Sequence, residues 1–136
     1  MKREFSAGGV VFNDQGQVLL IIVDAAKRHY WEFPKGHIDG DETTKVAALR
    51  EVEEEAGIKT EIADKIDISK YIYTSRTGEK IFKVVTFFLM KYLNGEPKPM
   101  EGEIAEVGWF TPQEAMKKLS FAQDKQHLAK ALEMLS

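Results

Sequence analysis

The sequence predicts an α/β fold in which one mixed β-sheet carries helices on both faces. Segments rich in β-branched and aromatic residues alternate with segments whose apolar residues recur at helical spacing. Their order along the chain is two strands, a helix, three strands and two helices, which suits a sheet covered on both sides. The length of 136 residues is that of one domain, and no repeat or linker divides it.

Strands dominate the first part of the chain. Residues 5–12 and 18–23 are rich in β-branched side chains, and residues 13–16, Asn-Asp-Gln-Gly, have the composition of a turn. The two strands should therefore form a hairpin. Residues 31–34 should also be extended, since the proline that closes this segment disfavours helix in the residue before it. Residues 36–40 begin and end with glycine, which indicates a loop.

One helix is expected from Glu42 to Ala56. Asp41 is suited to its N-cap and Gly57 to the position after its last turn. The apolar residues of this helix fall on one stripe, which should pack on the sheet and leave the glutamates along an edge. The stripe consists of Ala48, Leu49, Val52 and Ala56.

Strand and helix signals alternate again in the second half. Strands are expected at residues 65–73, 80–92 and 106–110. Residues 111–114, Thr-Pro-Gln-Glu, form a capping box with proline at the first helical position, so a short helix should begin there. Residues 120–123, Ser-Phe-Ala-Gln, give a second signal of this kind ahead of a last helix.

Composition narrows the functional class. Without cysteine, the chain has no disulfide, thiolate metal site or cysteine nucleophile. It shows neither a signal-peptide pattern nor a run of ~18 apolar residues, so we expect a cytoplasmic protein without a membrane span. The formal charge of −3 gives no general attraction to nucleic acid, and stable nucleic-acid binding is not expected. An enzyme of this charge that acts on polyanions would need cations.

The stretch Arg50–Gly57, REVEEEAG, holds four glutamates in five positions. In a helix Glu51, Glu54 and Glu55 share a face, and each like-charge pair costs about 0.2–0.5 kcal/mol. A solvated helix face is the common explanation of such a run. Here, however, no lysine or arginine follows these three at helical spacing within the helix, and a glycine-bounded loop lies just upstream. Converging carboxylates are what Mg²⁺ and Mn²⁺ require, so we interpret the run as a cation site.

The spacing of these residues also resembles the signature of the Nudix family. Gly36, Glu42, Arg50-Glu51-Val52, Glu54-Glu55 and Gly57-Ile58 match every specified position of that signature. The similarity extends over essentially the whole sequence. The resemblance implies a Nudix-type α/β/α sandwich with a mixed β-sheet, a structural role for Glu42, and hydrolysis of a nucleoside diphosphate linked to another group.

The resemblance also assigns roles within the signature. Glu51, Glu54 and Glu55 correspond to metal ligands, and the carbonyl oxygen of Gly36 to a further one. Arg50 corresponds to the arginine that orients the first of these glutamates, and together these residues form the expected catalytic group. The implied metal is Mg²⁺ or Mn²⁺, since metals that bridge phosphate oxygens neutralise charge and activate water for attack.

The segment upstream of the helix suggests a substrate. Trp31-Glu32-Phe33-Pro34-Lys35-Gly36-His37 resembles the corresponding segment of the asymmetric diadenosine tetraphosphate hydrolases. By that resemblance Lys35 contacts the phosphate chain. Lys83, which begins the run Lys-Val-Val-Thr-Phe-Phe, corresponds to a second phosphate-binding lysine. A solvated loop lysine and an edge-strand lysine are the ordinary alternatives for these two positions.

Three further positions follow from the same resemblance. Glu103 falls where those hydrolases have a loop glutamate that joins the metal site, with Glu101 and Glu106 as alternatives for that position. Tyr73 and Phe121 correspond to the two aromatic residues that stack on adenine, an interaction worth ~1–3 kcal/mol per base. Ordinary core packing is the alternative for both aromatic residues.

We therefore predict that residues 1–136 form a single Nudix hydrolase domain, which binds a small nucleotide and cleaves diadenosine tetraphosphate asymmetrically to ATP and AMP. The Trp-x-Phe-Pro motif is also similar to a motif of RNA 5′-pyrophosphohydrolases. Triphosphate-ended RNA or another nucleotide pyrophosphate is therefore the alternative substrate. A non-catalytic nucleotide-binding module is disfavoured because every carboxylate of the signature is present. No feature of the sequence predicts an oligomeric state.

Overall fold

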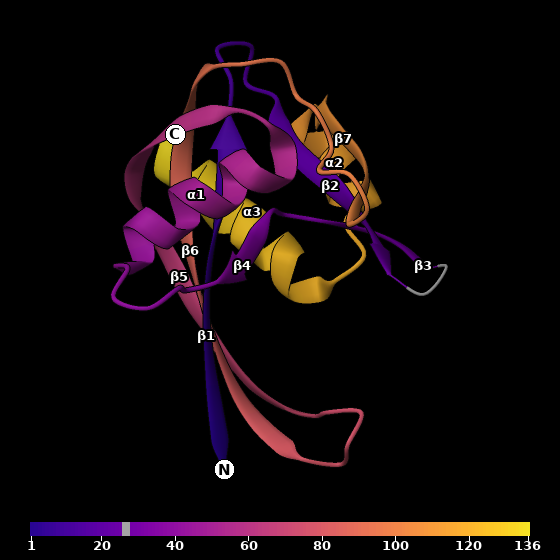
Figure 1. Cartoon of the computed structure of the whole chain (residues 1–136). Helices are drawn as coiled ribbons and strands as arrows, with labels where there is room; N and C mark the ends of the chain where they lie inside the picture. Colours follow the sequence, from indigo (N-terminus) through magenta and orange to yellow (C-terminus); the bar gives the residue numbers. More distant parts are fainter. Residues whose placement is uncertain (26–27) are drawn as a thin grey trace.

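The computed structural model describes residues 1–25 and 28–136, and within them a seven-stranded mixed sheet lies between two layers of helices (Figure 1). The predicted α/β sandwich is confirmed. The strands are β1 (Lys2–Phe12), β2 (Val18–Ala25), β3 (Arg28–Glu32), β4 (Lys35–His37), β5 (Lys59–Thr74), β6 (Lys80–Asn94) and β7 (Ile104–Phe110). The helices are α1 (Thr44–Ala56), α2 (Pro112–Lys118) and α3 (Ala122–Leu135).

The sheet has the order β3-β2-β1-β6-β5, with β4 paired to β1 and β7 paired to β2. β1 and β6 run parallel from the pair Lys2–Ile81 to the pair Phe12–Lys91, and the other strand pairs are antiparallel. The predicted hairpin of β1 and β2 exists at its turn, where Phe12 pairs with Val18. Beyond that pair, β2 pairs with β3 and β7, and β4 pairs with β1.

Two hydrophobic cores fill the spaces on either side of the sheet, because successive strand residues point to opposite faces. Each Val, Leu or Phe side chain buried there contributes about 1.5–3 kcal/mol to folding. The core toward α2 and α3 includes Val10, Leu20, Phe87, Leu128 and Ala131. The core toward α1 includes Val11, Leu19, Phe88, Ala48 and Val52. Of the predicted helix stripe, Ala48, Val52 and Ala56 are fully buried and Leu49 is partly buried.

Helix α1 begins two residues later than predicted, and its N-cap is Thr43 rather than Asp41. The Thr43 hydroxyl accepts a hydrogen bond from the N–H of Val46 at 3.2 Å. The backbone of Glu42 lies before the helix, because its carboxylate binds groups of the preceding loop. The predicted C-terminus is confirmed: Gly57 has a φ of 78° and donates its N–H to the carbonyl of Glu53.

The two C-terminal helices begin in different ways. At α2 the predicted capping box is present, with Thr111 and Glu114 exchanging hydrogen bonds of 2.9 and 3.1 Å. The second predicted capping signal was wrong, since α3 has Phe121 at its N-cap and no side-chain cap bond. Ser120 instead bonds to Trp31 on β3, through both its hydroxyl and its N–H, at 3.0 and 3.1 Å.

Most strands are longer than predicted, as is β1, which begins at Lys2 rather than Phe5. β5 begins at Lys59 rather than residue 65, because register shifts at three points along this strand interrupt the apolar alternation from which strands are recognised. β7 begins at Ile104 rather than Glu106. The segment 36–40 was expected to be a loop, but its first residues belong to β4, a strand too short to produce a periodic pattern.

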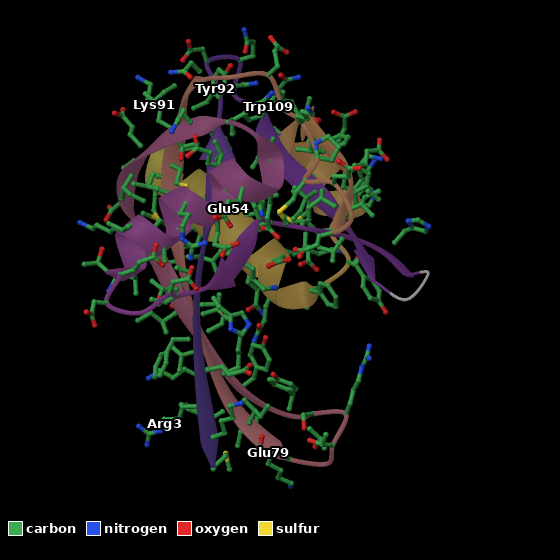
Figure 2. The ribbon with its side chains drawn as sticks, viewed as in Figure 1. Arg3, Glu54, Glu79, Lys91, Tyr92 and Trp109 are labelled. Carbon is green, nitrogen blue, oxygen red and sulfur yellow. The ribbon has the colours of Figure 1, made fainter. Side chains whose placement is uncertain are left out.

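The end of β5 and the start of β6 project beyond the helical layers together with the start of β1 (Figure 1). Arg3 and Glu79, labelled in Figure 2, lie on this projection, well away from Glu54 on α1. No helix in the described part of the chain has both the length and the apolar character needed to cross a membrane.

Candidate functional site

Arg50 on α1 fastens the loop between β4 and the helix. Its guanidinium binds both carboxylate oxygens of Glu42, at 2.7 and 2.9 Å, and also donates to the carbonyl of His37 at 2.9 Å. Asp39 lies 3.3 Å from the same group. Glu42 in turn accepts the N–H of Asp39 at 2.8 Å. Glu42 therefore joins the loop to the start of the helix, as the sequence suggested.

Arg50 also neutralises part of the glutamate run. Its Nη1 donates to Oε1 of Glu51 at 2.8 Å and to Oε2 of Glu54 at 3.1 Å. Arg50 precedes Glu54 by four residues, so one of these contacts is the (i, i+4) pair of a helix, and both contacts relieve repulsion within the run. The hydrogen bonds with Glu42 first, and then with Glu51 and Glu54, raise the pKa of Arg50 above its usual value. Glu54, labelled in Figure 2, is half exposed on α1.

Glu51 lies against the backbone of β4. A Cβ added at Gly36 would overlap the carboxylate of Glu51, so the space that glycine leaves is the space that this carboxylate occupies. Burial raises the pKa of Glu51 despite its bond to Arg50, and the negative charge of Glu54 adds to the shift. Gly36 and Glu51 are therefore in contact, and their role as metal ligands stays a prediction.

Glu55 is the most deeply buried of the three helix carboxylates that the sequence singled out, with 8% of its surface exposed. One of its oxygens accepts the main-chain N–H of Lys35 at 2.8 Å. Burial, reinforced by the carboxylates of Glu51 and Glu32, raises the pKa of Glu55 to about 8. A buried carboxylate surrounded by like charges is stabilised by a bound cation more than a solvated one would be.

The three glutamates fit a hard divalent cation by the chemistry of their oxygen donors. Among the described residues, no three acidic or histidine side chains already stand in a metal-holding arrangement. Arg50 binds one oxygen each of Glu51 and Glu54, so a cation would have to bind the other oxygens or displace it. Glu103 is exposed in the turn before β7, and within the described part of the chain it does not form a metal-holding group with the carboxylates of α1.

The loop that carries Glu103 is nevertheless tied to the end of α1. The N–H of Met100 donates to the carbonyl of Glu55 at 3.2 Å, and the N–H of Lys98 donates to that of Ala56 at 2.8 Å. Glu103 follows three residues after Met100, whose carbonyl accepts the N–H of Ile104 at 3.0 Å. The chain is therefore held against the end of α1 only a few residues before Glu103, the predicted loop ligand.

A pocket of about 400 Å³ lies on the α3 side of the sheet. Its floor is made by β5 and β6, and its rim by the turn from β3 to β4 and the first turn of α3. Two predicted substrate-binding residues, Lys35 and Phe121, line it, together with Tyr71, which the sequence had not singled out. Phe121 packs against Tyr30 with ring centroids 5.1 Å apart, and 42% of its surface is exposed.

Lys35 belongs to both the pocket and the carboxylate edge. Its N–H binds Glu55, while its side chain lines the pocket and lies 3.6 Å from Glu32. Burial by itself would lower the pKa of Lys35, but the carboxylates of Glu32, Asp124 and Glu55 outweigh this effect, and the pKa is raised. Lys35 therefore remains a cation at the junction of the two sites.

The other two predicted substrate residues, Tyr73 and Lys83, are linked by Glu4 rather than by the pocket. The Tyr73 hydroxyl donates to Glu4 at 2.6 Å, which raises the pKa of Tyr73 to about 12. Lys83 is buried 3.7 Å from the same carboxylate. Burial lowers the pKa of Lys83, with Glu4 opposing the shift and Lys35 adding to it. Neither residue lines the pocket.

Sequence reasoning missed Tyr71 although its signal was present. Ser69, Tyr71 and Tyr73 alternate along β5 and therefore share one face. Tyr71 and Tyr73 lie with ring centroids 6.4 Å apart, Tyr71 being the one nearer the pocket. Choosing between them required the position of the pocket along the strand, which the sequence does not contain.

The comparisons with known proteins all indicate one family. The model of the NUDIX domain matches residues 2–132. MutT4 of Mycobacterium tuberculosis is 35% identical over 140 residues, which cover 98% of this chain and 56% of that protein, so this chain spans just over half of its length. The asymmetrical bis(5′-nucleosyl)-tetraphosphatase of Caenorhabditis elegans is 28% identical over 121 residues, covering 87% and 86% of the two chains.

Solved structures agree with this match. The crystal structure of a binary complex of the C. elegans Ap4A hydrolase superimposes with a TM-score of 0.78 at 28% identity, covering 97% of each chain. The MutT Nudix hydrolase of Burkholderia pseudomallei gives a TM-score of 0.75 at 27% identity, covering 96% of this chain and 98% of the other.

Proposed function

Because the chain belongs to the Nudix hydrolase family, we propose that it is a metal-dependent pyrophosphohydrolase of dinucleoside tetraphosphates such as diadenosine tetraphosphate. In this proposal residues 1–136 act as one catalytic domain. The substrate is cut off-centre, so that diadenosine tetraphosphate gives ATP and AMP. The similarity over most of both chains to the asymmetrical tetraphosphatase of C. elegans supports this choice of substrate.

The carboxylates of α1 are the proposed metal site. Nudix hydrolases generally use divalent metal ions, and Glu51, Glu54 and Glu55 would hold Mg²⁺ or Mn²⁺ together with the carbonyl of Gly36. Glu103 is a further ligand in this proposal, brought in by movement of its exposed side chain. When bound, the metal would neutralise phosphate charge and activate a water molecule.

The remaining residues would position the substrate. Arg50 holds Glu51 and Glu54 in place through hydrogen bonds of 2.8 and 3.1 Å. Lys35 and Lys83 would bind phosphate oxygens through charge-assisted hydrogen bonds. Phe121, with an aromatic residue of β5, would stack on one base.

One observation carries the proposal, namely that Lys35 joins the pocket to the carboxylate edge. A nucleoside held in the pocket would extend its phosphates past Lys35 toward Glu55. The reactive phosphate would then lie at a fixed number of phosphates from the anchored base. A symmetric substrate would in that case be cut asymmetrically.

Product analysis in ¹⁸O-labelled water tests this function. The purified chain with Mg²⁺ should convert diadenosine tetraphosphate to ATP and AMP, with the label in only one of the two products. Formation of two ADP molecules would contradict the proposed register. Release of pyrophosphate from triphosphate-ended RNA, with the dinucleotide left intact, would favour the RNA pyrophosphohydrolase alternative instead.

A further inference from the structure

The pocket has a polar inner wall that the proposed function does not use. Apolar side chains such as Val85 and Phe87 form most of its floor, while Ser69 on β5 and Asp124 on α3 also line it. Both polar residues are buried, with 9% and 7% of their surfaces exposed. Each has one partner within the protein, Ser69 the ring of His127 and Asp124 the N–H of Phe33. Each also keeps acceptor capacity that a ligand in the pocket could use.

His127 connects these two residues. Its Nε2 lies 3.1 Å from the hydroxyl of Ser69, and its Nδ1 lies 4.0 Å from Oδ1 of Asp124. Nδ1 is buried and has no hydrogen-bond partner among the described residues. Burial lowers the pKa of His127, so near neutral pH the ring carries one proton, on one of its two nitrogens.

The carboxylate of Asp124 decides which nitrogen carries that proton. A proton on Nδ1 faces the negative charge of Asp124, which is favourable even at 4.0 Å in a buried site. Nε2 then accepts the hydrogen of the Ser69 hydroxyl. The lone pairs of Ser69 are left for a ligand in the pocket. Ser69 and Asp124 therefore both present hydrogen-bond acceptors.

We propose that this pocket selects guanine over adenine, with Asp124 and Ser69 as the residues that determine base specificity. Guanine carries adjacent donors, N1–H and the 2-amino group, which match the two oxygens of the Asp124 carboxylate, and Ser69 supplies a further acceptor in the same pocket. Adenine offers its 6-amino group beside the N1 lone pair, and that lone pair would face an acceptor without a hydrogen bond. A site built for hydrogen bonds rejects a ligand that leaves its polar groups unpaired.

Asp124 is an acceptor at working pH although its surroundings disfavour its negative charge. Burial raises the pKa of Asp124 to about 6, with Glu32 adding to the shift and Lys35 and the N–H of Phe33 opposing it. Above pH 7 the carboxylate is therefore ionised. His127 on the same helix also faces the carboxylate, with its Nδ1 4.0 Å from Oδ1.

This inference rests on the proposed function only for the phosphate chain of the substrate. Its test compares three tetraphosphates that differ in the base edge alone: diguanosine, diinosine and diadenosine tetraphosphate. At pH 7.5 with Mg²⁺, the whole chain should give kcat/KM values that fall in that order, with guanine preferred over adenine by about tenfold or more. Inosine, which lacks the 2-amino group, should lie between them.

Substitutions locate the preference. Asp124→Asn keeps an oxygen for the N–H of Phe33 but adds a donor that matches N1 of adenine, so the guanine-to-adenine ratio should fall to about one or below. Ser69→Ala should reduce the ratio by less. Asp64→Asn, at an exposed position of β5, is the matched control and should leave the ratio unchanged. Equal kcat/KM values for guanine and adenine in the parent, or an unchanged ratio in Asp124→Asn, would overturn the inference.

A binding measurement separates this inference from the proposed function. If the parent cleaves none of the three tetraphosphates, the proposed function fails, and the base preference is measured by calorimetric titration of GMP and AMP into the metal-free chain. Tighter binding of GMP, lost in Asp124→Asn, would still support base selection. GMP binding no tighter than AMP would overturn it.

Discussion

At the scale of single residues, Glu55 combines burial with negative charge. Its side chain is 8% exposed, and the neighbouring carboxylates of Glu51 and Glu32 disfavour its ionised form further. Ionised Glu55 therefore costs folding free energy when no cation is bound. A divalent cation that binds the folded chain would reverse this cost and stabilise the protein by mass action.

Glu55→Gln tests this account. The amide keeps an acceptor for the N–H of Lys35 but removes the charge, so we expect hydrolysis to fall by about 100-fold or more. Without metal, the melting temperature should stay equal or rise slightly because a repulsion of about 0.2–0.5 kcal/mol per pair is gone. Mg²⁺ should raise the melting temperature of the parent more than that of the variant. Near-normal turnover at saturating Mg²⁺ would remove Glu55 from the proposed ligands.

The aromatic residues of β5 provide a second prediction at this scale. Tyr71 lines the pocket, whereas Tyr73 bonds to Glu4. Tyr71→Ala should therefore weaken substrate binding by the ~1–3 kcal/mol of one stacked base, which is measured as a higher KM. Tyr73→Ala should raise KM much less. Steady-state kinetics of the two variants, with Phe121→Ala as a positive comparison, would decide between them. A larger KM effect in Tyr73→Ala would support the assignment of Tyr73 made from the sequence.

At the scale of elements, β4 and α1 together position the carboxylates of the proposed metal site. The three residues of β4 pair with β1, and the middle one, Gly36, leaves room for a carboxylate of the helix. Arg50 then ties the connecting loop to α1 through Glu42 and the carbonyl of His37. A short strand and a helix are thereby held so that the helix carboxylates border the strand backbone.

Gly36→Ala should disrupt the contact between β4 and α1. The added methyl group would overlap the carboxylate of Glu51, so Glu51 must move, and we expect activity to fall by about tenfold or more with a stability loss of roughly 1–3 kcal/mol. Gly16→Ala is the control: this turn glycine has a φ of 74° and open space around it. That variant should lose about 1 kcal/mol of stability through backbone strain while keeping its activity. Equal activity in both variants would show that Glu51 tolerates displacement.

At the scale of the whole molecule, two helical layers serve two parts of the proposed reaction. The layer of α1 carries the carboxylates, and the layer of α3 closes the pocket, with the sheet between them. Asp124 ties the start of α3 to the turn after β3, because the N–H of Phe33 bonds to its carboxylate. Its ionisation should therefore influence the stability of the whole fold.

We expect Asp124→Asn to change the pH dependence of unfolding. The pKa of Asp124 is raised from 3.8 to about 6 in the folded chain, so the folded state holds this proton more tightly than the unfolded state. The parent should lose this contribution as pH rises from about 4 to about 6, and the loss should level off above pH 7. The variant lacks it, so its free energy of unfolding relative to the parent should increase over that range.

Urea unfolding of both metal-free proteins from pH 4 to pH 8 measures this difference, since other titrating groups largely cancel between them. A variant that instead becomes relatively less stable as pH rises would show that Lys35 and Phe33 hold the carboxylate in its ionised form. In that case burial would not be the dominant influence on Asp124.

The sequence by itself determined the fold class, the Nudix signature and the ends of elements that depend on local chemistry. Gly57 ends α1 and Thr111 begins α2 as predicted, because left-handed backbone and capping bonds involve residues only a few positions apart. Local patterns gave the wrong helix start where the side chain expected to lie in or cap the helix binds a residue farther along the chain instead. Glu42 binds Arg50 and lies outside the helix, and Ser120 bonds to Trp31 instead of capping α3.

The tertiary structure alone decided which side chains meet. The sequence could identify Glu51, Glu54 and Glu55 as neighbours because one helix turn brings them together. It could not show that Arg50 holds two of them, that Glu55 is buried against β4, or that Tyr71 rather than Tyr73 lines the pocket. Nor could it bring together Ser69, Asp124 and His127. These contacts join residues far apart in the chain, and their geometry depends on strand register and helix packing, which no local pattern encodes.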